Sequence, residues 1–311
     1  MKIGKVNIKG PLVLAPMADV TDLPFRILCK RQGADLVYTE MVNLNALARN
    51  NKSTEKRILI TKEERPIAIQ LFGTRTDPLR ESIELIEDLT DIIDFNLGCP
   101  AQQIVGSGAG AALLKRPKKV GELVSALVKY SSKPITVKMR LGYEKNNAVK
   151  LAKIIEENGA DAIAIHGRTY KQGYSGKANW DAIKEVKDSV NIPVIGNGDI
   201  RTPEEAKQRL ELCDAIMIGR GAMGDPTLFR RIKTYLKNGK LEPLPDVNEK
   251  IDLFLEYHEI AKKYDIVRLH ILRHRAQDIT KSLRGATGYR REISNFKTPE
   301  ELVKYMKSLK D

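Results

Sequence analysis

The sequence has little cysteine and no long apolar stretch. Only three of its 311 residues are cysteines, Cys29, Cys99 and Cys213. They are far apart and odd in number, so neither a disulfide framework nor a zinc site is expected, and a reducing cytoplasm fits best. No apolar run approaches the ~18 residues that span a membrane, and the start lacks the long apolar core of a signal peptide. We therefore expect a cytoplasmic protein, monomeric, without membrane contact and without a bound metal.

Acidic residues are too few to balance the basic ones. The chain has 53 Lys and Arg against 40 Asp and Glu, a formal net charge of +13. Such a charge suggests a polyanionic partner, and nucleic acid is the commonest. A merely basic, well-solvated enzyme is the alternative, and the charge alone does not separate the two.

Short apolar runs recur, each followed by a helical pattern. The runs are residues 12–15, 36–39, 67–72, 92–95, 135–139, 162–165, 193–196 and 215–218. Most are uniformly apolar, as in strands that are buried on both faces of a parallel sheet. Asp77-Pro78, Pro117 and Thr202-Pro203 precede helical patterns, as an N-cap followed by proline does. Eight strands alternating with helices over about 240 residues predict a (β/α)₈ TIM barrel.

A doubly wound sheet is the alternative fold. It would need a glycine-rich turn after its first strand, and LVLAPMADVTD (12–22) contains no glycine. After Lys240 the pattern changes to a segment with two prolines and then to helical patterns without strand-like runs. We predict a barrel domain over 1–240 and a small all-α domain over 241–311.

The C-terminal ends of barrel strands carry the active site, so the polar residues that follow each run are candidates. Any one of them could have a structural role, but polar groups at the same end of all eight strands are hard to explain by stability alone. The candidate residues at these strand ends, polar residues and their immediate neighbours, are Pro16, Met17, Ala18, Glu40, Gln70, Asn96, Cys99, Lys138, Arg140, His166, Arg168, Asn197, Gly198, Asp199, Gly219 and Arg220.

The residue types at these ends fit one ligand. NGD (197–199) and GRG (219–221) follow strands seven and eight, where barrels usually bind phosphate. Lys138 lies within a buried strand and needs an anionic or strongly polar partner. Gln70 offers the donor and the acceptor that a heterocyclic imide edge requires. Together these features describe flavin mononucleotide (FMN), although other phosphorylated ligands would fit the last two strands.

Several motifs resemble those of the tRNA-dihydrouridine synthases over essentially the whole barrel. They are APMADVTDLPFR (15–26), FNLGCP (95–100), VKMRLG (137–142), HGRTYKQGYSGKANW (166–180), GNGDI (196–200) and IGRGAMGDP (218–226). RHRAQDITKSLRGATGYRRE (273–292) resembles the family's basic C-terminal helix, with Arg273-His274-Arg275 where an Arg-Lys-His order is common.

The resemblance implies a reaction and a set of site residues. FMN would reduce the C5–C6 double bond of uridine in tRNA, and NADPH (or NADH) would re-reduce the flavin. Cys99 would donate the proton to C5, as a mostly protonated thiol can. Asn96 would hydrogen-bond the uracil edge, and Arg168 would also serve the substrate. The FMN site would comprise Pro16, Met17, Ala18, Gln70, Lys138, His166, Asn197, Gly198, Asp199, Gly219 and Arg220.

The C-terminal part supports a tRNA partner. Residues 262–297 contain ten basic and three acidic residues, a net charge of +7, which favours phosphate contact over a merely solvated helix face. We assign Arg273 and Arg275 to the tRNA. The other basic residues of this segment are Lys262, Lys263, Arg268, Lys281, Arg284, Arg290, Arg291 and Lys297.

Two other functions stay open. A dihydroorotate dehydrogenase-like enzyme would share the barrel, the FMN and a cysteine facing a pyrimidine, but it would not need the basic extension. A tRNA-binding protein that has lost catalysis would not need Cys99, Lys138 and the phosphate loops together.

Overall fold

Eight parallel strands close into a barrel in the computed structural model, which describes residues 1–49, 51, 54, 56–281, 283 and 285–310. The neighbours pair in chain order, β11 pairs with β3, and a bridge between Val13 and Leu36 joins β3 to the segment leading into β4. The predicted TIM barrel is therefore confirmed, and each predicted run contains a strand. The strands are β3 (Leu12–Leu14), β4 (Val37–Tyr38), β6 (Ile67–Phe72), β7 (Ile92–Leu97), β8 (Ile135–Arg140), β9 (Ala162–His166), β10 (Val194–Asn197) and β11 (Ala215–Ile218).

Three short strands lie outside the predicted pattern. A hairpin of β1 (Lys2–Ile3) and β2 (Val6–Asn7) precedes the barrel, and β5 (Val42–Asn43) pairs with the end of β6. Each of these strands has only two residues, too few to show the alternation of apolar and polar side chains, so the sequence did not predict them.

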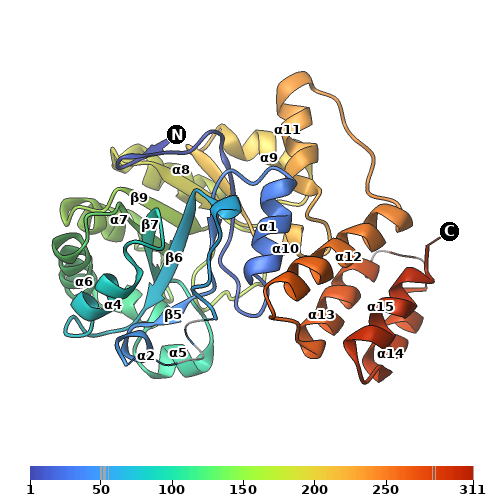
Figure 1. The fold of residues 1–311 in the computed structure, drawn as a ribbon. Helices are drawn as coiled ribbons and strands as arrows, with labels where there is room; N and C mark the ends of the chain where they lie inside the picture. The colour runs from blue at the N-terminus through green and yellow to red at the C-terminus, as the bar shows by residue number, and fades with distance from the viewer. Residues whose placement is uncertain (50, 52–53, 55, 282, 284, 311) are drawn as a thin grey trace.

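Helices surround the barrel (Figure 1). Thr202 caps α9 in a capping box with Glu205, and Pro117 is the first residue of α6, as predicted. Asp77 does not cap α4, because the helix begins one residue later and Asp77 pairs with Arg75 instead. The helices are α1 (Leu23–Arg31), α2 (Leu44–Ala48), α4 (Leu79–Ile86), α5 (Gln102–Gly106), α6 (Pro117–Tyr130), α7 (Ala148–Glu157), α8 (Trp180–Ser189), α9 (Pro203–Leu210), α10 (Arg220–Met223) and α11 (Leu228–Asn238), with 3₁₀ turns η1 (Lys62–Glu64) and η2 (Gly110–Lys115).

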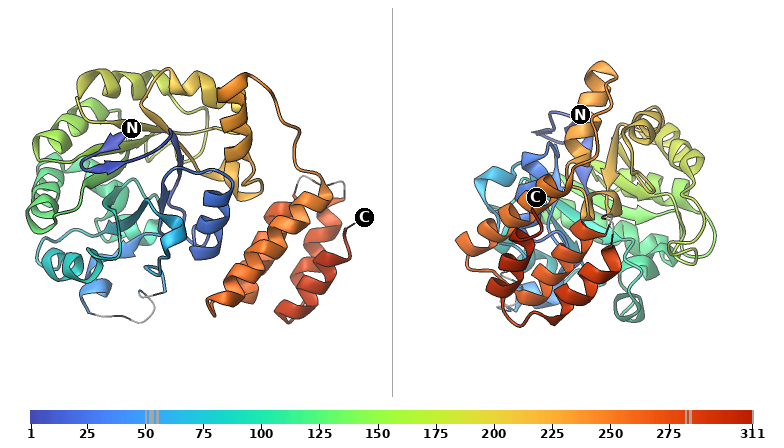
Figure 2. Two further views of the ribbon diagram at one scale, coloured as in Figure 1. Left: turned by 45° about the horizontal axis from the view of Figure 1, so that its top comes forward. Right: turned by 90° about the vertical axis from the view of Figure 1, so that its right-hand side faces the viewer.

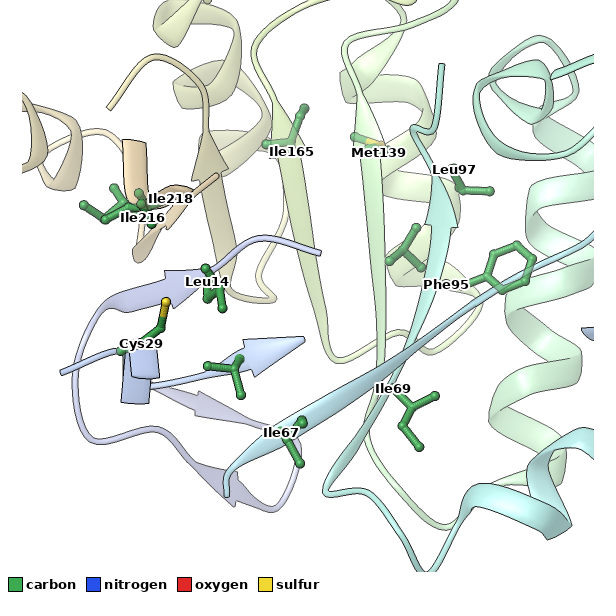
Figure 3. Close-up of a cluster of buried hydrophobic side chains, with 14 of the residues drawn as sticks. Leu14, Cys29, Ile67, Ile69, Phe95, Leu97, Met139, Ile165, Ile216 and Ile218 are labelled. Carbon is green, nitrogen blue, oxygen red and sulfur yellow. The ribbon is translucent and has the colours of Figure 1, made fainter. Parts of the chain in front are cut away.

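Alternation along each strand separates two apolar cores. Outward residues such as Ile69, Phe95 and Met139 pack beneath the helices (Figure 3). Inward residues such as Val13 and Met217 form a smaller cluster inside the barrel. Because side chains alternate between faces, a polar residue at an inward position can only point into the barrel. This rule places the site.

The C-terminal helices stand to one side of the barrel, next to α1 and α10, as Figures 1 and 2 show. They are α12 (Val247–Lys263), α13 (Leu269–Thr280), α14 (Ala286–Asn295) and α15 (Pro299–Lys307). Residues 241–246 contain neither helix nor strand, and the predicted boundary lies at the start of this segment. The stretch 273–292, which resembles one basic helix of the family, is divided in the structure: α13 ends at Thr280, and α14 is a separate helix that the sequence did not predict. None of the helices in the described residues could cross a membrane.

Candidate active site

A cavity of about 540 Å³ opens at the C-terminal ends of the strands. That volume is within the ~300–1,000 Å³ range of small-molecule sites. All residues that the sequence assigned to FMN line it, together with Cys99 and Asn96. The cavity therefore gathers side chains from seven strands or the loops that follow them: Pro16, Met17, Ala18, Gln70, Asn96, Cys99, Lys138, His166, Asn197, Gly198, Asp199, Gly219 and Arg220.

A chain of hydrogen bonds runs along the inner wall from a buried carboxylate to Cys99. Gln70 Nε2 donates to Asp94 Oδ2 at 2.7 Å, and Asn96 Nδ2 donates to Gln70 Oε1 at 2.8 Å. Asn96 Oδ1 then accepts from the backbone amides of Gly98 and Cys99, at 3.0 and 2.8 Å. Both Asp94 oxygens accept, one from Gln70 and one from Thr136, and this pattern sets which way each amide points.

Cys99 is held beside this chain as a protonated thiol. Arg140 Nε donates to the Gly98 carbonyl at 3.0 Å, so the turn is held from both sides. Burial raises the pKa of Cys99, and the opposing effects of the Ala101 amide, Lys138 and Arg140 are smaller. The thiol is thus suited to give up a proton, not to act as a thiolate nucleophile.

Positive charge dominates the cavity. Among the described residues that line it, four are cationic, Lys138, Arg140, Arg201 and Arg220, and one is anionic, Asp199. Burial and the neighbouring Arg140 lower the pKa of Lys138 to about 8, although Asp94 raises it. Burial and the same cations lower the pKa of His166 to about 2, so its ring is neutral at physiological pH. The charge balance calls for an anionic ligand.

The loop after β10 forms the anionic corner of the site. Asp199 has a positive φ of 52° and accepts from Arg168 Nη2 at 2.6 Å, from the Ala178 amide at 2.8 Å and from Arg220 Nη2 at 3.3 Å. Burial alone would raise its pKa, but these donors outweigh burial and lower it. Gly198, with φ of 137°, has no room for a side chain, since a Cβ would lie 2.6 Å from that of Ala178. Arg220, which pairs with Asp199, also lines the cavity at this end, where phosphate was expected.

Three of the four residues assigned to the substrate lie away from the cavity. The fourth, Asn96, lines the cavity, and its amide also bonds Gln70 and the Cys99 turn within the protein. Arg168 is outside the cavity lining and holds Asp199. Arg273 is half-buried and donates to the Phe296 carbonyl. Arg275 is 2% exposed and contacts Val20 and Phe25 of the barrel, so its side chain is not at the surface where tRNA was expected. Arg284 lies outside the described residues.

Several site residues were missed by sequence reasoning. Asp94 and Thr136 stand at inward positions of β7 and β8, where Thr136 Oγ1 donates to Asp94 Oδ1 at 2.6 Å. Tyr174 lines the cavity mouth, 57% exposed, with the Arg220 guanidinium 4.4 Å from its ring centroid. Alternation within the apolar runs could have pointed to the first two residues. Cys213 lies between α9 and β11 and is half-buried.

The fold and the site together define a class of protein: a (β/α)₈ barrel with a cationic ligand cavity at its strand ends and a protonated thiol on the cavity wall. Comparison with known proteins narrows this class. The family model for dihydrouridine synthase matches residues 13–311. This chain belongs to the dihydrouridine synthase family.

Curated relatives agree with the family match. A probable tRNA-dihydrouridine synthase of Rickettsia prowazekii (strain Madrid E) is 41% identical over 285 residues, which cover 88% of this chain and 87% of the relative. The tRNA-dihydrouridine synthase B of Pasteurella multocida (strain Pm70) is 36% identical, over 87% and 85% of the two chains.

Solved structures share the fold at low identity. A 6-hydroxypseudooxynicotine amine oxidase from Pseudomonas geniculata N1 superposes with a TM-score of 0.61 at 12% identity, over 82% of this chain and 52% of the other. Histamine dehydrogenase from Rhizobium sp. 4-9 gives a TM-score of 0.55 at 14% identity, over 84% and 50%.

Proposed function

We propose that this enzyme reduces the C5–C6 double bond of uridine in tRNA, with FMN in the cavity and NADPH as the reductant. The observation that carries the proposal is the protonated thiol of Cys99 on the wall of a cationic cavity. Family membership supports the reaction, and the curated relatives are named for it. We also propose that the protein is a monomer and acts in the cytoplasm.

The residues of the cavity fit FMN. The excess of cations complements a phosphate, and the glycine-rich corner after β10 and β11 leaves backbone amides accessible to it. Gln70 of β6 and Lys138 of β8 both line the cavity, on either side of β7, where an amide and a cation would meet the polar edge of the flavin ring. When bound, the flavin supplies the hydride that is added to C6 of the uracil.

The chain's own residues complete the reduction. Negative charge develops toward C5 and the C4 carbonyl as the hydride is added, and C5 then needs a proton. Cys99 Sγ gives this proton, while Asn96 and Arg140 hold its turn through the Cys99 amide and the Gly98 carbonyl. Lys138 is mostly protonated at pH 7, because its pKa is about 8, and its positive charge stabilises the forming anion.

The substitution Cys99→Ala tests this division of labour. The variant should retain bound flavin and its reduction by NADPH, because the thiol only delivers the proton to C5. Dihydrouridine formation should fall by ~10²–10⁴, the usual contribution of a general acid. Cys213→Ala, at a half-buried thiol away from the cavity, is the matched control. Stopped-flow flavin reduction that fails in Cys99→Ala, or full dihydrouridine synthesis, would contradict the assignment.

The basic C-terminal helices fit a tRNA partner. Lys281, Arg290, Arg291 and Lys297 are exposed and can contact phosphates. A target uridine must leave its stack to reach a site at the bottom of a cavity, and a separate basic surface would hold the tRNA meanwhile.

A further inference from the structure

Arg275 is a cation buried between the helical region and the barrel. It projects from α13, and its guanidinium carbon is 4.1 Å from the centroid of the Phe25 ring on α1. Its Nη2 donates at 2.8 Å to the carbonyl of Val20, which is 255 residues away in sequence. Its Nε and Nη1 have no hydrogen-bond partner among the described residues. Such a position excludes phosphate contact and is costly for a guanidinium.

Tyr257 of α12 makes a second polar contact to the same segment. Its hydroxyl donates to Asp22 Oδ2 at 2.6 Å. Asp22 is the N-cap of α1, where its other oxygen accepts from the Phe25 amide at 3.4 Å and lies 4.0 Å from Arg275 Nη2. We call Asp22, Tyr257, Arg275 and the Val20 carbonyl the loop joint.

The loop joint grips a wall of the active site. The segment between β3 and α1 supplies Pro16, Met17, Ala18 and Val20 to the cavity lining. Helix α13 also touches the adjoining segment after β11. A Cβ on Gly224, which follows cavity-lining Met223, would be only 2.6 Å from the Asp278 carbonyl oxygen. The helix that carries the basic segment therefore rests on two edges of the cavity.

Apolar contacts alone could hold the two parts together. Leu23 and Ile27 of α1 already pack on Ile260 of α12. Replacing buried charges by well-packed apolar residues is often neutral or stabilising, so the polar contacts are not needed for adhesion. The polar contacts of Arg275 and Tyr257 instead fix how the helices are placed relative to the loop. Hydrogen bonds are directional, so bonds to the Val20 carbonyl and to the Asp22 carboxylate favour one relative position.

We propose that Arg275 and Tyr257 are positioning residues that hold the cavity-lining loop of residues 16–22 in register with the basic helices. A substrate bound on those helices then meets a cavity wall of fixed shape. The inference rests on the proposed function for its consequence in catalysis, but the joint itself can be tested without tRNA or flavin.

Amide hydrogen exchange tests the joint directly. Arg275→Met keeps the apolar stem, and Tyr257→Phe removes one hydroxyl, so either variant can stand alone if the other folds poorly. Hydrogen bonds to charged groups are worth enough to slow local opening about tenfold to hundredfold. We expect amides of residues 17–26 to exchange at least about tenfold faster in Arg275→Met, while those of β8 and β9 are unchanged. Unchanged rates in 17–26, or an equal rise in β8 and β9, would overturn the proposal.

The salt dependence of tRNA binding separates positioning from phosphate contact. A side chain that contacts a phosphate contributes about 0.7–0.9 to the slope of log K against log salt. We expect Arg275→Met to leave this slope unchanged, whereas Arg291→Gln on exposed α14 serves as the phosphate-contact comparison. A slope lowered by Arg275→Met would show that Arg275 contacts the tRNA and would overturn the positioning role.

Steady-state kinetics with tRNA test whether the position of the loop matters for catalysis. In Arg275→Met, kcat/KM for tRNA, expressed per bound flavin, should fall about tenfold or more. Flavin content is measured in parallel, because the loop also supplies Pro16, Met17 and Ala18 to the proposed flavin site. Unchanged kcat/KM would overturn the catalytic consequence. If the parent enzyme forms no dihydrouridine, the proposed function fails, and hydrogen exchange still decides whether the joint holds the loop.

Discussion

Asp94→Asn should make the stability of the protein depend on pH in a way that can be calculated. Asp94 is fully buried inside the barrel, and burial raises its pKa from 3.8 to about 7 despite hydrogen bonds from Thr136 and Gln70 and the charge of Lys138. Asparagine keeps the shape. Its oxygen can accept from Gln70, and its amide can donate to the Thr136 hydroxyl, which then acts as acceptor. The variant is therefore expected to fold.

The magnitude follows from linkage. A carboxyl group whose pKa is higher in the folded than in the unfolded chain binds protons more tightly when folded, so the free energy of unfolding falls as pH rises through this window. A shift of roughly three units at 1.36 kcal/mol each gives about 4 kcal/mol, lost between about pH 4 and pH 7. Asparagine does not titrate. The stability of Asp94→Asn relative to the parent should hence rise by ~1.4 kcal/mol per pH unit in this window.

Urea unfolding of both proteins between pH 4.5 and 8.5 measures this difference. Titrating groups that do not interact with Asp94 cancel when the two free energies are subtracted. Lys138, whose pKa of about 8 is raised by Asp94, is the exception, and its titration falls at the upper end of this pH range. Asp88→Asn, at an exposed residue of the turn after α4, is the control for loss of a carboxylate. A difference that stays flat between pH 5 and 8 would mean that Asp94 carries the same charge in the folded and unfolded chain, and would refute the reasoning.

Three further substitutions probe the ligand end of the cavity, two at cations and one at a glycine. Lys138→Ala and Arg220→Ala should each purify with less flavin, read from the ratio of flavin to protein absorbance, and the loss should be larger for the more buried Lys138; full flavin content in both would contradict the site. Gly198→Ala should lower the free energy of unfolding by ~1–3 kcal/mol, because φ is 137° and the new methyl would lie 2.6 Å from Ala178 Cβ. Gly106→Ala is the control, because no atom lies within 4 Å of a Cβ at that position. Equal melting temperatures for the two variants would contradict the steric argument.

The barrel could be predicted because its signals are local. Each buried strand is a short apolar run, and turn chemistry marks several helix starts, as in the Thr202 capping box. The missed strands are two residues long and depend on a neighbour, as β5 does on β6. Asp77 shows the limit of cap signals, since its carboxylate pairs with Arg75 and the helix begins beyond it.

The cavity lining could be predicted from position, but the partners of its side chains could not. Asn96 lines the cavity, as its position predicts, but its bonds to Gln70 and to the Cys99 turn were not predicted. Such partners depend on which inward residues of adjacent strands stand level, as Gln70 does with Asp94, and sequence spacing alone does not give that register.

Periodicity could have corrected the assignment of Arg275, where charge misled. The buried residues of α13 are Ile271, Leu272, Arg275, Ala276, Ile279 and Thr280. These positions recur at three to four residues, so Arg275 stands on the apolar face of the helix. Arg273 and His274 fall off that face, and both are more exposed than Arg275. The charge of a side chain indicates which ligands it can bind. Its position in the helical or strand period indicates whether it faces solvent or the core. Read with the period of two in β7, the same rule places Asp94 inside the barrel, beneath the site, and Phe95 outside it. A basic residue in a basic segment is thus evidence for nucleic-acid contact only after its helix face has been assigned.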